Sequence, residues 1–252
     1  MRDGIEYHLW RHALADGDVT TVYAVRHPAP KTRVRVVYFP RPEHLDVWCA
    51  ANGVGEAVVG GFFLRDPYRP LGELWLEGRP ARHEPILPPY GPRRACVVVD
   101  PDDGVARVVE RGAAPAQPAG DLVQAGPLLV AGGKVVFDAD DDREGFSAGT
   151  GQFDSDITKG RYPRAALGVS DEWLVAVACD GRRSNVDGGL SMPELAEVMV
   201  ELGSESAINL DGGGSTTLVH RAHLLNRPYS SQDQPAPASR RVVSALAFEP
   251  RA

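Results

Sequence analysis

The residue types best suited to chemistry lie together in the segment from Asn209 to Thr217. An amide, a carboxylate, three glycines and hydroxyl groups follow one another there, at Asn209, Asp211, Gly212, Gly213, Gly214, Ser215, Thr216 and Thr217. Consecutive glycines favour a backbone that turns through positive φ or lies close to a ligand. Successive N–H groups in such a turn can converge on an anion. We therefore expect an anion-binding turn with Asp211 beside it, against the alternative of a plain glycine hairpin.

Polar side chains also stand at the ends of two apolar runs. Asp180 and Arg182 directly follow the apolar run 174–179, and Arg164 precedes the apolar run that begins at Ala165. A guanidinium group matches phosphate or carboxylate oxygens in bidentate geometry. Because several strand ends carry such groups, we expect them to share one pocket at one edge of the sheets.

The elements that must position these residues are short strands with turn sequences between them. Strands or hairpins are expected at residues 20–26, 33–39, 71–76, 95–110, 126–136 and 165–179. One helix is expected at 43–51, and a second begins at the capping box Ser191–Glu194 and ends at Gly203. The pattern predicts an α+β fold in a single domain over residues 1–252, with β-rich mixed sheets and a few short helices packed against them.

Composition excludes several classes of protein. The 252 residues carry 27 basic and 34 acidic side chains, a formal charge of −7, which argues against a nucleic-acid partner. The cysteines Cys49, Cys96 and Cys179 form no pair with metal or disulfide spacing. The first residues lack the apolar stretch of a secretory signal. No apolar segment is long enough to span a bilayer. We expect a soluble, cytoplasmic protein, or a secreted one if the sequence was trimmed, and the oligomeric state is not predicted.

Several short motifs follow one another in a fixed order along the chain. They are Gly60-Gly61-Phe62-Phe63, Gly126-Pro127-Leu128-Leu129, the run 162–169, Asp180-Gly181-Arg182, the run 189–196, the run 209–217, Asn226-Arg227-Pro228 and the run 240–247. This series resembles the phosphodiester glycosidase family over about residues 55–248. Two positions depart from the family pattern, with Val59 where Asn is common and Ala165 where Thr is common. If either position contacts substrate, the substrate differs from that of the family.

The resemblance implies a hydrolase that cleaves the bond between a sugar anomeric carbon and a phosphodiester, without a cofactor. Asp211 is the first choice for the catalytic carboxylate and Asp180 the second, because an oxocarbenium-like state needs a nearby carboxylate. Asn209 is expected to orient the carboxylate or sugar hydroxyls. The expected substrate-binding residues are Gly61, Arg164, Arg182, Gly212, Gly213, Gly214, Ser215, Thr216 and Arg240. The expected partner is a small-molecule sugar phosphodiester or glycan.

Other functions remain open from the sequence. One alternative is a non-catalytic carbohydrate-binding or exopolysaccharide accessory protein, and another is a different glycosidase or a phosphodiesterase on the same scaffold. A metal is not expected. Asp138, Asp140 and Asp142 alternate as at the start of a calcium loop, but Arg143 occupies the position that needs Gly.

Overall fold

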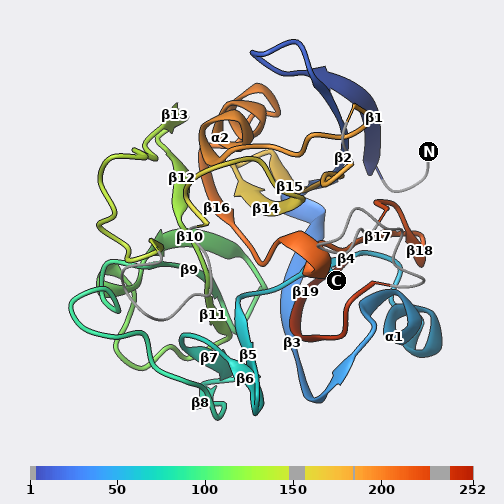
Figure 1. The fold of residues 1–252 in the computed structure, drawn as a ribbon. Helices are drawn as coiled ribbons and strands as arrows, with labels where there is room; N and C mark the ends of the chain where they lie inside the picture. The colour runs from blue at the N-terminus through green and yellow to red at the C-terminus, as the bar shows by residue number, and fades with distance from the viewer. Residues whose placement is uncertain (1–3, 148–156, 184, 228–238, 252) are drawn as a thin grey trace.

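Large antiparallel sheets build the molecule, which a computed structural model describes over residues 4–147, 157–183, 185–227 and 239–251 (Figure 1). The seven-stranded sheet has the order β1 (Glu6–Ala13), β2 (Val19–Pro28), β15 (Trp173–Cys179), β14 (Arg164–Val169), β16 (Ser206–Asn209), β12 (Leu128–Ala131) and β13 (Lys134–Val135). A five-stranded sheet has the order β10 (Ala106–Glu110), β9 (Ala95–Val99), β11 (Leu122–Gln124), β7 (Leu74–Leu76) and β8 (Arg79–Pro80).

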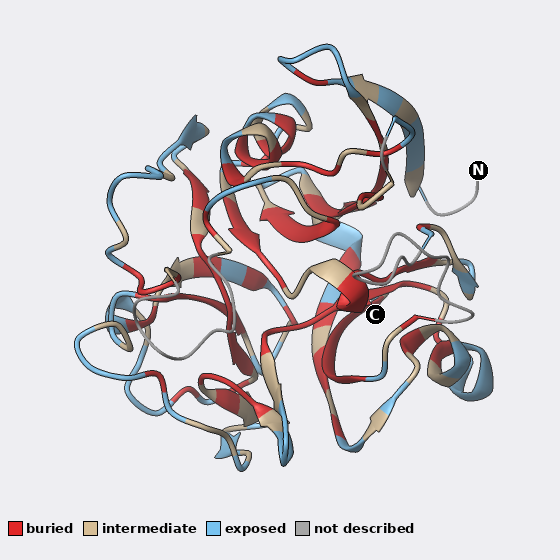
Figure 2. Ribbon diagram, viewed as in Figure 1, coloured by how far each residue is buried: buried red, intermediate tan, exposed pale blue. Residues whose placement is uncertain are grey.

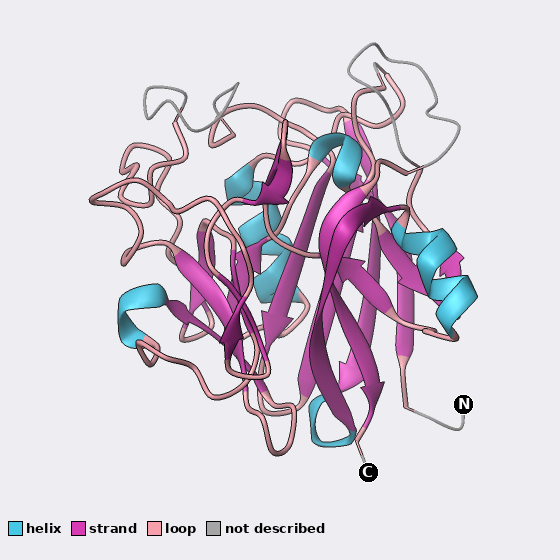
Figure 3. Ribbon diagram, turned by 90° about the horizontal axis from the view of Figure 1, so that it is seen from below, coloured by secondary structure: helices cyan, strands magenta, loops and turns pink. Residues whose placement is uncertain are grey.

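The remaining strands and the helices complete the described chain. The other five-stranded sheet has the order β18 (His223–Leu224), β17 (Leu218–His220), β4 (Ala57–Val59), β19 (Val242–Pro250) and β3 (Thr32–Glu43), and β5 (Phe63–Arg65) pairs with β6 (Tyr68–Pro70). The helices are α1 (Leu45–Asn52), α2 (Met192–Glu201) and the 3-10 turns η1 (Ala29–Lys31), η2 (Arg111–Ala113) and η4 (Gly213–Ser215). Figure 3 shows the strands stacked closely, with α1 on an outer flank. No helix in the described ranges is long and apolar enough to cross a membrane.

Both faces of the central β14–β15 hairpin are buried, as Figure 2 shows for the middle of the molecule. Because side chains alternate along a strand, Ala176 and Ala178 pack in the core shared with the five-stranded sheets. Val175 and Val177 face the other way and pack with α2. A strand buried on both faces reads as a continuous apolar run, which explains why this hairpin is visible in the sequence.

Helix α2 begins where the sequence places its start. The Ser191 hydroxyl accepts a hydrogen bond from the Glu194 N–H, and the Glu194 carboxylate accepts one from the Ser191 N–H at 2.9 Å. Leu195 and Met199 face the sheet, and Gly203, with φ +83°, ends the helix as expected. The capping box and the apolar stripe thus dock α2 against the sheet whose strand β16 carries Asn209.

Most of the expected elements are confirmed. The α+β class and its sheet-rich character hold, with the refinement that every pairing between named strands is antiparallel. The strand expected over residues 71–76 begins only at Leu74 and pairs with β8. Strand β1 was not expected, because most of its side chains are exposed and it carries no apolar alternation. The β5–β6 hairpin was also missed, and it turns out to border the pocket described below.

The capping box gives a test of how α2 is held. Replacing Ser191 with Ala removes the acceptor for the Glu194 N–H and is expected to lower the free energy of unfolding by about 1 kcal/mol. Chemical denaturation measures this change. Glu197→Ala, at an exposed position on the same helix, serves as the control and is expected to change stability by less than about 0.5 kcal/mol. Equal stability of the two variants would contradict the assigned cap.

Candidate active site

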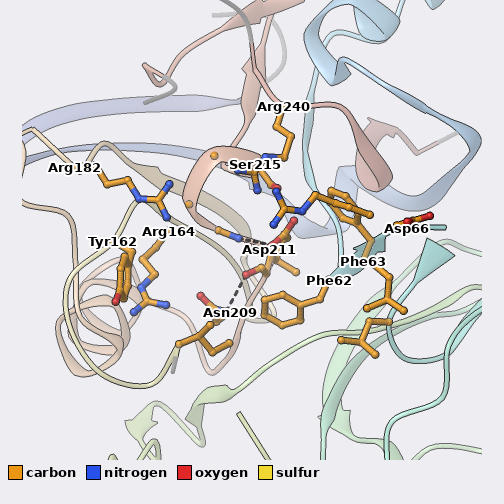
Figure 4. Close-up of a pocket in the computed structure, with 18 residues that line it drawn as sticks. Phe62, Phe63, Asp66, Tyr162, Arg164, Arg182, Asn209, Asp211, Ser215 and Arg240 are labelled. Carbon is orange, nitrogen blue, oxygen red and sulfur yellow. Dashed lines mark hydrogen bonds between the residues drawn. The ribbon is translucent and has the colours of Figure 1, made fainter. Parts of the chain in front are cut away.

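One pocket of about 500 Å³ collects most of the expected site residues. Its wall is formed by β5, by the start of β14, by the turn after β15, by the segment from the end of β16 through η4, and by the segment before β19. Asn209, Asp211, Arg164, Arg182 and Arg240 all line it, as Figure 4 shows. The convergence expected from separate strand ends is therefore present in the structure.

Asp211 stands two residues beyond the end of β16 and is held by its backbone. Its N–H donates to the Gly60 carbonyl at 2.9 Å, and its carboxylate accepts the Gly212 N–H at 2.9 Å. Burial raises the pKa of Asp211 to about 6, while the nearby Ser215 hydroxyl, the Gly212 N–H and the charge of Arg240 oppose this rise. A carboxyl group with this pKa exchanges protons readily near neutral pH, which suits a general base or acid.

Asn209 presents a hydrogen-bond acceptor to the pocket. Its Nδ2 donates to the carbonyls of Gly126 and Leu210, both at 2.8 Å. These two bonds fix the orientation of the amide, because the opposite flip would set Oδ1 against two carbonyl oxygens. Oδ1 is buried and has no partner among the described residues. A buried acceptor without a partner is rare in native proteins, which makes Asn209 Oδ1 a candidate acceptor for a ligand donor.

Two of the three N–H groups expected to bind an anion at the glycine turn already have acceptors within the protein. The Gly212 N–H is bound by the Asp211 carboxylate and the Gly213 N–H by the Pro163 carbonyl at 2.8 Å. The glycines matter because they have no side chains. A Cβ at Gly213 would lie 3.0 Å from Nη2 of Arg182, and one at Gly214 would lie 2.7 Å from Nη2 of Arg240. The glycines therefore leave room for two guanidinium groups against the turn.

Arg182 and Arg240 bring positive charge to the pocket, and no carboxylate in the described part of the chain pairs with either. Neither takes part in any ion pair found in the described ranges. Nη1 of Arg182 is buried with no hydrogen-bond partner there, and the guanidinium lies 5.9 Å from the centre of the Tyr162 ring. Burial and the charge of Arg240 lower the pKa of Arg182. Two uncompensated cations side by side indicate an anion site.

Arg164 is a less available cation than expected. Its Nε donates to the Leu190 carbonyl at 3.0 Å and its Nη2 to the Gly160 carbonyl at 3.2 Å. Burial lowers the pKa of Arg164 to about 10. Arg164 lines the same pocket as Arg182 and Arg240, as expected, but backbone carbonyls already fix two of its nitrogens.

Three expected site residues lie outside the pocket lining. Asp180 is buried, with its carboxylate accepting from Tyr23 Oη at 2.9 Å and from the Arg227 N–H at 2.6 Å. Burial raises the pKa of Asp180 to about 6. Thr216 is buried behind the turn, and a Cβ at Gly61 would lie 2.5 Å from the Gln124 carbonyl. Asp180 ties the end of β15 to the segment after β18, and Gly61 permits close packing of backbones.

The lining also includes residues that were not expected from the sequence. They include aromatic and charged side chains from around the β5–β6 hairpin and from the segment just before β14, namely Phe62, Phe63, Arg65, Asp66 and Tyr162. Phe62 packs against Phe146, with ring centres 5.6 Å apart. The Gly-Gly-Phe-Phe motif marked the start of this wall, but no local pattern showed that Arg65 and Asp66 would line the same pocket as Asp211.

The two departures from the family pattern lie in the core. Val59 on β4 and Ala165 on β14 are fully buried in the main hydrophobic cluster, and neither lines the pocket. The condition under which they would change the substrate, direct contact with it, is therefore not met at either position in this pocket. In the acidic loop, the Asp142 carboxylate accepts N–H groups of Phe146 and Ser147. Within the described ranges, no three acidic, His or Cys side chains gather as a metal site would require.

Comparisons with known proteins place the chain in a family. The model of the phosphodiester glycosidase family matches residues 52–249, and the chain belongs to this family. The catalytic domain of zebrafish N-acetylglucosamine-1-phosphodiester alpha-N-acetylglucosaminidase, auto-inhibited by its pro-peptide, has the same fold. It superposes with a TM-score of 0.73 at 19% identity over 98% of this chain and 83% of that one.

Two bacterial structures share the fold as well. A hypothetical protein from Synechocystis has a TM-score of 0.67 at 20% identity, over 97% of this chain and 62% of that one. A protein from Burkholderia pseudomallei K96243, described as exported, has a TM-score of 0.68 at 19% identity, over 92% of this chain and 74% of that one. No curated protein sequence matches the chain.

The placement of Asp180 predicts a structural effect of its removal. Asp180→Ala leaves the buried Tyr23 hydroxyl and the part-buried Arg227 N–H without their acceptor, so we expect a loss of about 3 kcal/mol in the free energy of unfolding. Asp171→Ala, at an exposed turn of the same hairpin, is the matched control and should change little. Chemical denaturation compares the two. Wild-type stability of Asp180→Ala would show that this carboxylate does not hold the strand end.

Proposed function

We propose that this protein is a hydrolase that breaks the bond between a sugar anomeric carbon and the oxygen of a phosphodiester. The observation that carries the proposal is the presence, in one pocket, of the Asp211 carboxylate beside the guanidinium groups of Arg182 and Arg240, which form no ion pair within the described ranges. Family membership supports the reaction type, and the name of the zebrafish relative describes an enzyme for this class of bond.

The arginine pair suits the leaving group. When the C1–O bond breaks, both bonding electrons stay on the phosphate oxygen, and the released phosphomonoester carries one more negative charge than the diester. Such a leaving group needs positive partners rather than a proton donor. Arg182 and Arg240 supply two guanidinium groups at the glycine turn, where their fixed positions suit them to stabilise the developing charge.

Asp211 suits the sugar side of the bond. As C1 loses the phosphate oxygen it gains positive character, which a carboxylate stabilises, either directly or by taking a proton from an attacking water. The water oxygen then bonds to C1, and its proton passes to Asp211 or to solvent. The pKa of about 6 leaves most Asp211 side chains ionised at neutral pH and ready for this role.

Asn209 suits recognition of the sugar. Its Oδ1 is a hydrogen-bond acceptor for which no described residue supplies a donor. A sugar hydroxyl group can supply that donor. The aromatic rings of Phe62 and Tyr162 border the same space and offer apolar faces to the ring carbons. The pocket thus joins an anion site, a carboxylate and a hydroxyl acceptor, which is the set that a sugar phosphodiester needs.

A phosphodiesterase that attacks phosphorus is the second candidate, because the same arginines would bind its substrate. A carbohydrate-binding protein without catalysis is less well supported. A pure binder gains nothing from a half-buried carboxylate that titrates near pH 6 beside two arginines, because its charge then changes with small shifts of pH.

The first test removes the carboxylate charge. Asp211→Asn is expected to fold normally and to lower kcat/KM by about 10³-fold on a sugar-1-phosphate methyl diester, beginning with N-acetylglucosamine as the sugar. Wild-type kcat/KM is expected to fall as pH drops below about 6, where Asp211 takes up a proton, and the variant should lack this limb. Asp171→Asn on the exposed turn is the control. Turnover of the Asp211 variant at the wild-type rate would remove Asp211 from the mechanism.

The second test identifies the broken bond. Hydrolysis in water enriched in heavy oxygen, followed by mass spectrometry of both products, is expected to place the label in the sugar hydroxyl. Label in the phosphomonoester would mean attack on phosphorus and would favour the phosphodiesterase. Absence of turnover across a panel of sugar-1-phosphate diesters and nitrophenyl glycosides would favour the binding protein.

A further inference from the structure

Arg182 and Arg240 lie against adjacent residues of one turn. Nη2 of Arg182 approaches the Cβ position of Gly213 at 3.0 Å, and Nη2 of Arg240 approaches that of Gly214 at 2.7 Å. Neighbouring Cα atoms are about 3.8 Å apart, so the turn brings the two guanidinium groups to one small region of the pocket wall. Figure 4 shows both side chains reaching this turn from different segments.

Like charges so placed repel each other, and the part of the protein that the structure describes supplies no carboxylate between them. Neither arginine has an ion-pair partner in the described ranges, and Nη1 of Arg182 is buried without a hydrogen-bond acceptor. Leaving a buried donor unpaired is costly, so the arrangement is relieved when an anion with several oxygens binds. The pair is a preformed oxyanion site.

The described lining of the pocket contains more arginines than aspartates. Arg65, Arg164, Arg182 and Arg240 line it, together with Asp66 and Asp211. The pair formed by Arg182 and Arg240 carries two positive charges, and a ligand with two negative charges matches them better than a ligand with one.

We propose that Arg182 and Arg240 form a site that selects phosphate dianions over monoanionic phosphodiesters, so that the phosphomonoester released by the enzyme, and inorganic phosphate, compete with its substrate. The preference for the dianion depends only on the arginine pair. The competition with substrate depends in addition on the proposed function. A diester carries one negative charge and two substituted oxygens. The monoester carries up to two charges and three free oxygens, and therefore makes more charge-assisted hydrogen bonds to the two guanidinium forks.

Direct binding tests the selection without any need for turnover. Isothermal titration calorimetry of the whole protein compares methyl phosphate with dimethyl phosphate, which differ by one methyl group and one ionisable oxygen. At about pH 7.5, methyl phosphate is expected to bind about tenfold more tightly or better. Affinities within about twofold of each other would overturn the proposal.

The pH dependence separates the ligand's charge from that of the protein. The methyl phosphate dianion takes up a proton near pH 6 and becomes a monoanion, so its advantage over dimethyl phosphate is expected to shrink toward about one as pH falls to 5. Asp211 loses its charge over the same range, since its pKa is about 6, and this change strengthens the binding of any anion. Dimethyl phosphate reports that effect alone, and its affinity should rise as pH falls. A preference that stays constant with pH would contradict selection by charge.

Variants assign the site to the two arginines. Arg182→Gln and Arg240→Gln each remove one positive charge and are expected to lower the methyl-to-dimethyl preference severalfold. Arg107→Gln, at an exposed position on β10 away from the pocket, should leave it unchanged. If a Gln variant does not fold, the corresponding Lys variant retains the charge and is expected to keep the preference with weaker binding of both ligands. An unchanged preference in folded Gln variants would place the ligand elsewhere.

Kinetics then connect the site with the proposed reaction. Methyl phosphate and inorganic phosphate are expected to inhibit hydrolysis of a sugar-1-phosphate diester competitively, and the free sugar should inhibit less. If methyl phosphate inhibits more tightly than inorganic phosphate, the site recognises the ester product. If the two inhibit equally, the site binds free phosphate as well. Dianion selection without turnover of any diester would refute the proposed function but not the site. Turnover without dianion selection would refute the site alone.

Discussion

The tight placement of the glycine turn after β16 is the constraint on which the pocket depends. The turn is bound on one side through the Asp211 N–H to the Gly60 carbonyl and on the other through the Gly213 N–H to the Pro163 carbonyl. These bonds hold it between β4 and β14, which belong to different sheets. With its backbone fixed, any side chain at Gly213 or Gly214 would occupy the space that the guanidinium groups now fill.

This constraint separates the positive and negative groups of the pocket. Asp211 binds the N–H of its own neighbour and forms no ion pair in the described ranges, so the arginines remain open to a ligand. Arg164 and Asp180, which resemble catalytic groups in the sequence, are instead bound by backbone groups or by Tyr23. The bonds of Arg164 and Asp180 hold the ends of β14 and β15 in place.

Local patterns predicted the parts of the fold that follow local rules. The β14–β15 hairpin is apolar on both faces, and α2 has a capping box, so both can be predicted from the sequence alone. The exposed strand β1 and the short β5–β6 hairpin have no such pattern. The site shows the same limit. Polar residues at strand ends predicted a pocket shared by Asn209, Asp211, Arg164, Arg182 and Asp180, and all of these except Asp180 line it. Arg240 was expected only from the family resemblance. The burial of the Asp180 side chain and the presence of Arg65 in the lining depend on contacts between distant segments.

A crystal structure with a non-hydrolysable sugar-1-phosphonate diester tests the central claim most directly. We predict that the phosphonate oxygens lie within hydrogen-bond distance of Arg182 and Arg240. We also predict that the anomeric carbon faces the Asp211 carboxylate and that a sugar hydroxyl donates to Asn209 Oδ1. A complex with the sugar at the arginines, or with the ligand bound outside this pocket, would contradict the proposed site.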